Sequence, residues 1–277
     1  MKKGFETRFI DWGLRASVVG VIVFFYVPIF TLILFSFKQG RYLNLPFEGW
    51  TLAWYGDLLT NAEVARSARN SLIIALCATI ISTAVGLGTA QSIVRYRFRG
   101  KTLFQILAMA PLVFPQLLLG VVLLLWFSVL GNIFDFSNNL TTAIIGHCVY
   151  LVPFTTIIIA VQAAGFDPVL EQAAQDFGAT RWEVFREVTF PILWPGIFSA
   201  AIFAFLLSWG NFYITYSLSG TERALPTFVF SGMALGSTPL YPALASVSFA
   251  VGMLLVILAE TMRRRSAAKT RMEFKTS

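Results

Sequence analysis

The stretch that decides the fold is a polar connection between two apolar runs, DPVLEQAAQDFGATRWEVFREVTFP, residues 167–191. Asp167 is a residue type that caps helices, and Pro168 follows in the first helical turn, where a missing N–H costs nothing. Gly178 suits a positive φ and therefore predicts the end of this first helix. The stretch thus predicts a short helix with a defined start and stop.

A second short helix is predicted directly after that glycine. Thr180 and Glu183 have the spacing of a capping box, in which each side chain bonds to the other residue's backbone N–H. Pro191 is predicted to end this helix just before the next apolar run, because proline cannot donate to the helical ladder. The whole connection, residues 163–191, is therefore predicted to be a compact helix–turn–helix.

Outside this connection the sequence is dominated by apolar runs. Of the 277 residues, 57% are hydrophobic and only 13% are charged, and the mean hydropathy is +0.72. Soluble domains carry about 25% charged residues, and about 20 apolar residues cross a bilayer as a helix. Six runs reach that length: 16–37, 71–93, 102–130, 141–162, 192–218 and 240–262. We therefore predict an all-α membrane protein with six transmembrane helices, forming one domain over 1–277 with its core at 67–262.

Two segments interrupt this simple pattern. The third run contains Pro111 and Pro115, so it should bend or break there. Residues 38–70 mix aromatic and charged residues and follow the first run. We expect them to form short interfacial helices whose aromatic rings lie at the level of the lipid headgroups.

The distribution of lysine and arginine predicts the orientation in the membrane. Sixteen of the 21 basic residues lie at the two ends of the chain, in the turn 94–101 or in the connection 163–191. Basic residues accumulate on the cytoplasmic side, so both termini and the connection are predicted to be cytoplasmic. The net charge of +7 is then explained by membrane topology, and no nucleic-acid partner is expected.

A long, gapped pattern runs through the connection. Its members are Gln172, Ala173, Ala174, Gly178, Val188, Phe190 and Pro191. This spacing resembles the cytoplasmic EAA motif of type I ATP-binding cassette (ABC) importer permeases, which have Glu at the first position and Leu before the proline. Further resemblance to spermidine/putrescine-type permeases lies in Asn70-Ser71, the run 96–101, Val152-Pro153-Phe154 and Gly165-Phe166-Asp167.

The resemblance implies a MetI-like type I permease fold in a bacterial inner membrane. It also implies that the connection docks on a separate ATPase, and that the motif glutamate makes a contact there. Because Gln172 stands at that position, Glu171 or Asp176 is expected to supply the charge. The partners implied are two ABC ATPase subunits, which bind ATP and Mg²⁺, a second and paralogous permease subunit, and a periplasmic solute-binding protein. No cofactor is expected in this chain.

The fifth run contains the candidate translocation pathway, SWGNFYITY, residues 208–216. Polar groups inside a span are costly and suggest function, which marks Trp209, Gly210, Asn211 and Tyr213. The resembling polyamine permeases carry acidic residues at the positions of Gly210 and Asn211, so a neutral, zwitterionic or singly charged solute is as compatible as a polyamine. The alternative is that Asn211 and Tyr213 only bond between helices. His147, the one histidine, is expected to make such a helix–helix bond.

Other function classes fit less well. The chain has no G-x-x-x-x-G-K-[ST] phosphate loop, because the only Gly-Lys pair, Gly100-Lys101, has Arg95 where the pattern needs its first glycine. An ion-gradient-driven secondary transporter is the main alternative, but it would predict carboxylates within the spans and repeated halves. A membrane enzyme would need clustered catalytic groups. We therefore predict a non-catalytic permease subunit for a small polar solute, of the polyamine, amino acid or related amine class, with no metal site.

Overall fold

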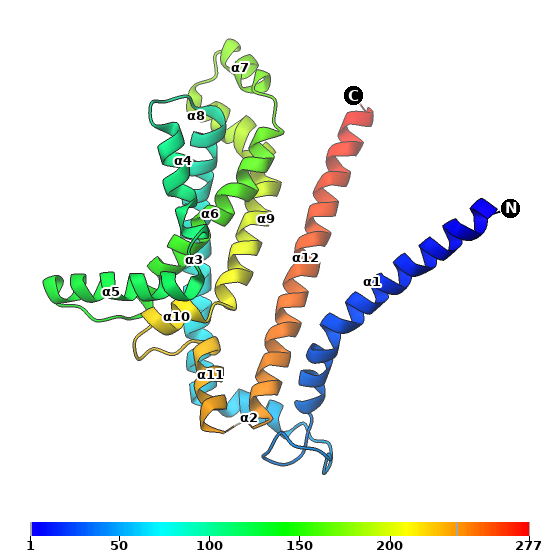
Figure 1. Cartoon of the computed structure of the whole chain (residues 1–277). Coiled ribbons are helices and arrows are strands. Elements are labelled where there is room, and N and C mark those ends of the chain that lie inside the picture. The colour runs from blue at the N-terminus through cyan, green and yellow to red at the C-terminus, as the bar shows by residue number, and fades with distance from the viewer. Residues whose placement is uncertain (1, 237, 277) are drawn as a thin grey trace. The chain divides into compact units, whose positions relative to one another are not determined.

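The computed structural model describes residues 2–236 and 238–276; positions 1, 237 and 277 of the predicted domain lie outside it. The chain divides into two compact units (Figure 1). One comprises residues 1–61 and 231–251, and the other comprises residues 62–230 and 252–277. The predicted single domain over 1–277 with a core at 67–262 remains a prediction.

Helices account for nearly all of the described residues. They are α1 (Lys2–Phe35), α2 (Ala53–Thr60), α3 (Ala62–Arg95), α4 (Lys101–Met109), the 3₁₀ turn η1 (Ala110–Leu112), α5 (Gln116–Phe134), α6 (Leu140–Ala164), α7 (Val169–Asp176), α8 (Arg181–Val184), the π-helical turn η2 (Phe185–Thr189), α9 (Phe190–Trp209), α10 (Tyr213–Leu218), α11 (Leu225–Leu235) and α12 (Leu240–Thr276). Six stretches are long and apolar enough to cross a membrane: Asp11–Phe35, Ala62–Arg95, Gln116–Phe134, Leu140–Ala164, Arg181–Trp209 and Leu240–Leu258. The prediction of six spans in an all-α protein is confirmed for the described residues.

The smaller unit contains α1, α2 and the turn-rich segment between them. Short interfacial helices were predicted for residues 38–70, and α2 is such a short helix, while the level of its aromatic rings in a membrane stays a prediction. The ring centroids of Phe37 and Tyr55 lie 5.4 Å apart. The hydroxyl groups of Ser36 and Tyr55 lie 2.6 Å apart, and the Trp54 indole N–H donates to the Lys38 carbonyl at 2.9 Å. These bonds hold α2 against the end of α1.

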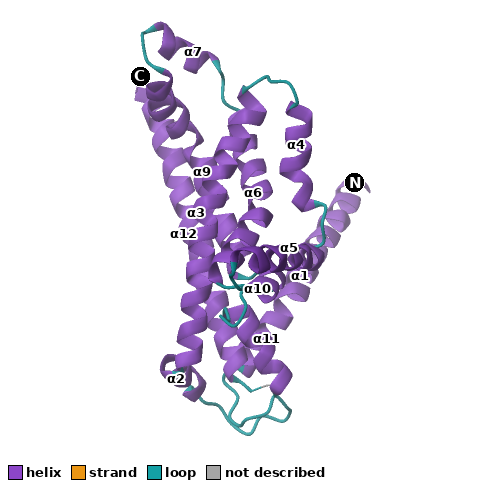
Figure 2. Cartoon of the chain, turned by 90° about the vertical axis from the view of Figure 1, so that its left-hand side faces the viewer, coloured by secondary structure: helices purple, strands orange, loops and turns teal. Residues whose placement is uncertain are grey.

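The larger unit is built on α3, α6 and α9, which run side by side (Figures 1 and 2). Small residues allow α3 and α6 to approach closely: a Cβ atom on Gly86 would overlap the Thr155 hydroxyl and lie 3.0 Å from the Thr156 backbone nitrogen. The Thr155 hydroxyl in turn donates to the Ser82 carbonyl at 2.8 Å. Close packing with hydrogen bonds between helices is how spans associate in lipid, where the hydrophobic effect does not drive them together.

The third apolar run breaks where its prolines predict. Because Pro111 and Pro115 cannot donate to the helical ladder, α4 ends at Met109, and α5 begins at Gln116 after one 3₁₀ turn. Figures 1 and 2 show α5 running across the direction of α3 and α6. The predicted break in the run 102–130 is therefore confirmed, and within this run only α5 is long enough to count as a span.

The orientation prediction stays a prediction. Many of the basic residues behind it lie in 1–10 and 262–277, whose side chains are outside the described part of the chain.

Candidate functional site

The connection between α6 and α9 folds largely as its capping residues and Gly178 predict. The Asp167 carboxylate accepts the Val169 backbone N–H at 2.9 Å and so caps α7, with Pro168 just before its first residue. Gly178 has a φ of +90°, which an L side chain rarely adopts, and it turns the chain after α7. Ala173 lies half-buried on α7. The first short helix is therefore confirmed.

The second helix begins as predicted and ends differently. Thr180 and Glu183 form the capping box, with the Thr180 backbone N–H donating to the Glu183 carboxylate at 2.7 Å. The prediction that Pro191 ends this helix is wrong, because α8 continues through η2 into α9 and Pro191 lies in the first turn of α9. The wider π turn at 185–189 precedes the proline. Such a turn accommodates a break in the hydrogen-bond ladder that would otherwise stop a helix.

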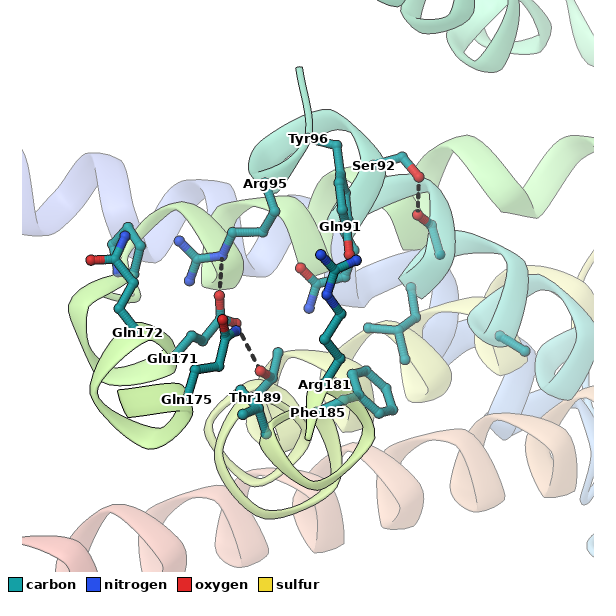
Figure 3. A pocket seen from close by; sticks show the side chains of 15 residues that line it. Gln91, Ser92, Arg95, Tyr96, Glu171, Gln172, Gln175, Arg181, Phe185 and Thr189 are labelled. Atoms are coloured by element: carbon teal, nitrogen blue, oxygen red, sulfur yellow. Dashed lines mark hydrogen bonds and ion pairs between the residues drawn. The ribbon is translucent and has the colours of Figure 1, made fainter. Parts of the chain in front are cut away.

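Glu171 points inward, towards the end of α3 (Figure 3). One of its carboxylate oxygens accepts the Thr189 hydroxyl proton at 2.7 Å, and the other lies 3.7 Å from Arg95 Nε. Arg95 also donates from Nη2 to the Phe166 carbonyl at 3.0 Å, and its guanidinium lies 4.5 Å from the centre of the Phe166 ring. These contacts tie Phe166, α7 and η2 to α3.

Several large apolar side chains are exposed on the same loop, among charged and polar ones. The Phe177 side chain is 93% exposed, and Trp182 is 67% exposed. Val169 and Leu170 at the start of α7 are exposed as well. Soluble surfaces seldom present several large apolar side chains together unless a partner covers them. Asp176 lies exposed at the C-terminal end of α7, among these residues.

A cavity of about 790 Å³ separates α7 and α8 from the last turns of α3 (Figure 3). Its lining mixes polar and apolar side chains, and the polar ones include Gln91, Arg95, Gln172, Gln175 and Arg181. Glu171 and Asp176, the two residues from which the charge was expected, face in different directions, and which of them supplies it stays a prediction. Glu171 faces this cavity and its internal partners, whereas Asp176 faces outward.

The candidate pathway residues lie at a break in the fifth run. The predicted continuous span 192–218 is wrong, since α9 ends at Trp209 and α10 begins at Tyr213. Gly210 lies exposed in the break, and Asn211 is only 3% exposed. The Asn211 side-chain oxygen accepts the Ile214 backbone N–H at 3.1 Å, which stabilises the first turn of α10. Its Nδ2 atom is buried without a hydrogen-bond partner among the described residues.

His147 on α6 bridges this break. Its Nδ1 atom lies 2.7 Å from the Ser208 hydroxyl on α9, and its Nε2 atom lies 2.9 Å from the Thr215 hydroxyl on α10. The imidazole is 1% exposed. The predicted helix–helix bond is therefore confirmed, but its two partners were not predicted, because serine and threonine are common in spans and carry no distinguishing pattern.

We expect His147→Ala to destabilise the break. The buried Ser208 hydroxyl loses its partner at a cost of about 1–3 kcal/mol, whereas the Thr215 hydroxyl keeps its bond to the Asn211 carbonyl. The midpoint of thermal unfolding in detergent should therefore fall by about 6 °C. His147→Asn keeps a polar group near the position of Nδ1 and should recover part of the loss. Equal midpoints for wild type and His147→Ala, measured by tryptophan fluorescence, would contradict this role.

No group of three or more His, Cys, Asp or Glu side chains is placed to hold a metal ion among the residues searched, which are those the structure describes.

Comparison with known proteins identifies a family and a fold. Residues 82–271 match the family model described as "Binding-protein-dependent transport system inner membrane component". The chain is 30% identical to the spermidine/putrescine transport system permease protein PotC of Haemophilus influenzae, over 91% of this chain and 96% of that protein. It is 31% identical to the putrescine transport system permease protein PotI of Escherichia coli K12, over 94% and 96%.

A solved structure shares the fold. It is the crystal structure of a bacterial alginate ABC transporter in complex with an alginate pentasaccharide-bound periplasmic protein. One of its chains superposes with a TM-score of 0.70 at 19% identity, covering 92% of this chain and 95% of that one.

Proposed function

The chain belongs to the family of binding-protein-dependent transport system inner membrane components, the multi-pass permeases of ABC importers, and on that premise we propose a specific role for it. It translocates a small polar solute of the polyamine, amino acid or related amine class, powered by two ABC ATPase subunits that bind ATP and Mg²⁺. A paralogous permease completes the membrane part, and a periplasmic solute-binding protein delivers the solute. The chain itself holds no cofactor and is not an enzyme.

The observation that carries the ATPase partnership is the exposed apolar tip of the loop 163–191. Phe177 projects almost completely into solvent next to the turn at Gly178. A phenyl ring exposed to water does not stabilise the loop. Burial of the same ring in a groove on another protein would contribute about 1.5–3 kcal/mol to binding. Together with the motif Gln172-Ala173-Ala174, this supports docking of the loop on an ATPase on the cytoplasmic side.

The solute class is supported by the two relatives, which are named as spermidine/putrescine and putrescine permeases. A polycation crossing a medium of low dielectric needs nearby negative charge. Neither Gly210 nor Asn211 supplies it, so the class proposed extends to amino acids and related amines. The ion-gradient-driven alternative is not favoured by the family match.

One experiment tests the proposed function directly. The complete importer is reconstituted in proteoliposomes, and radiolabelled putrescine is supplied with the binding protein. We expect uptake that requires ATP, stops with orthovanadate and continues when proton and sodium gradients are collapsed. Unlabelled amino acids and unlabelled spermidine are then compared as competitors of putrescine uptake, and the stronger competitor defines the solute class. Uptake by this chain without ATPases, driven by an imposed ion gradient, would reject the proposal.

A further inference from the structure

We propose that Arg95 and Glu171, together with Thr189, form a latch that fixes the loop 163–191 directly to α3. The proposal rests on the proposed function and refines it. Glu171 is then a positioning residue that acts through Arg95, and it does not supply the charge that meets the ATPase.

The first argument is that the Glu171 carboxylate already has its partners within this chain. Both of its oxygens face groups of this chain, the Thr189 hydroxyl at 2.7 Å and Arg95 Nε at 3.7 Å. The side chains of Arg95 and Glu171 are 13% and 20% exposed, and Thr189 is buried. A carboxylate that turns outward to reach another protein would leave the mostly buried Arg95 side chain without its counter-charge at the wall of the cavity. Such a loss is costly for a buried pair.

The second argument is the fixed position of Arg95. Its Nη2 group donates to the Phe166 carbonyl at 3.0 Å, and its guanidinium lies over the Phe166 ring. Arg95 is the last residue of α3, and Phe166 lies between α6 and α7. The planar guanidinium therefore meets a carbonyl, a ring and a carboxylate at once, an arrangement that a lysine ammonium cannot reproduce.

The third argument is the path that the latch creates. The backbone connects α7 only to α6 on one side and to α8 and η2 on the other. The Arg95–Glu171 pair adds a third attachment, to α3, and the Thr189 bond closes the loop against η2. Since α3, α6 and α9 form the packed centre of this unit, a displacement of α7 reaches all three helices together. A displacement is transmitted between distant parts of a protein through rigid, packed helices of this kind.

The latch is tested by the distance between α7 and the end of α3 in the assembled importer. Cys77 and Cys148 are replaced by alanine, and spin labels are attached at Tyr96→Cys and Asp176→Cys. We expect a narrow distance distribution in the wild type. Arg95→Ala and Glu171→Gln should each broaden it and add a longer distance, because the loop then loses the ion pair that joins α7 to α3.

A second measurement counts the putrescine imported per ATP hydrolysed. Allosteric couplings are typically worth five- to 150-fold, so we expect both variants to lower this ratio about fivefold or more. Co-purification of the ATPase with the permease should be unchanged, because the docking surface is intact. Arg99→Ala removes an exposed charge from the turn after α3, outside the loop 163–191, and it should match the wild type.

Three results would overturn the latch. They are a wild-type distance distribution in Arg95→Ala, a wild-type import ratio in both latch variants, and a loss of ATPase co-purification in Glu171→Gln. The last result would make Glu171 a docking residue. Failure of the proposed function is distinguishable, because it appears as a wild-type permease that binds no nucleotide hydrolase. The same distance measured on the permease alone in nanodiscs then still decides the latch.

Discussion

Replacing Phe177 with aspartate is expected to abolish uptake while leaving the permease folded in the membrane. The ring is 93% exposed, so its removal costs the isolated subunit almost nothing. At a docked interface the same ring would be a central apolar anchor, and truncating such an anchor costs about 2 kcal/mol or more. A carboxylate adds a desolvation penalty to that loss. Affinity for the ATPase should therefore fall by at least about thirtyfold.

The measurement is the dissociation constant between the permease in nanodiscs and its ATPase, alongside uptake in vesicles. Phe177→Leu retains an apolar side chain of similar size and should keep most of the affinity, which separates loss of apolar contact from loss of the residue itself. Wild-type affinity and uptake in Phe177→Asp would show that the tip of the loop does not dock, and the partnership would then need another surface.

Replacing Gly86 with valine is expected to have the largest effect on the fold. The first atom of any side chain there meets the Thr155 hydroxyl and the Thr156 backbone. Thr155 cannot simply rotate away, because its hydroxyl donates to Ser82 across the same crossing. Overpacking of this kind costs about 3 kcal/mol or more, because two helix backbones must separate. We expect the midpoint of thermal unfolding in detergent to fall by about 10 °C.

Gly88→Val provides a matched control on the same helix. Gly88 lies two residues further on, and a Cβ atom there meets nothing within 4 Å. The two variants share the same change in composition and in helix propensity, so the difference between their midpoints isolates the crossing of α3 and α6. Equal midpoints for Gly86→Val and Gly88→Val would mean that α3 and α6 can move apart at this crossing without measurable loss of stability.

Much of the fold could be predicted because its signals are local. The six apolar runs, the Asp167 cap, the Gly178 turn and the Thr180–Glu183 capping box depend on residues close in sequence, whose spacing is directly visible. The break at Pro111 and Pro115 belongs to the same class, since a proline acts on its own turn.

The rest could not be predicted because it depends on contacts between distant residues. The Arg95–Glu171 pair joins positions 76 apart, and nothing in the sequence distinguishes Glu171 from the exposed Asp176 nearby. The break at 210–212 is held from α6 by His147, and Gly210 is its only local signal. The continuation of α8 into α9 runs against the local signal of Pro191, because the π turn at 185–189 absorbs the irregularity.

That continuation has a mechanical consequence. The stretch from Arg181 to Trp209 is one helical rod of 29 residues, which at about 1.5 Å per residue is roughly 43 Å long. One end carries Trp182 beside the loop tip, and the other end reaches the break before Asn211. If this helix tilts by about 5° around its first end, its second end moves by roughly 4 Å, somewhat more than the diameter of a water molecule. A helix of this length therefore turns a small rotation at one end into a displacement of several ångströms at the other.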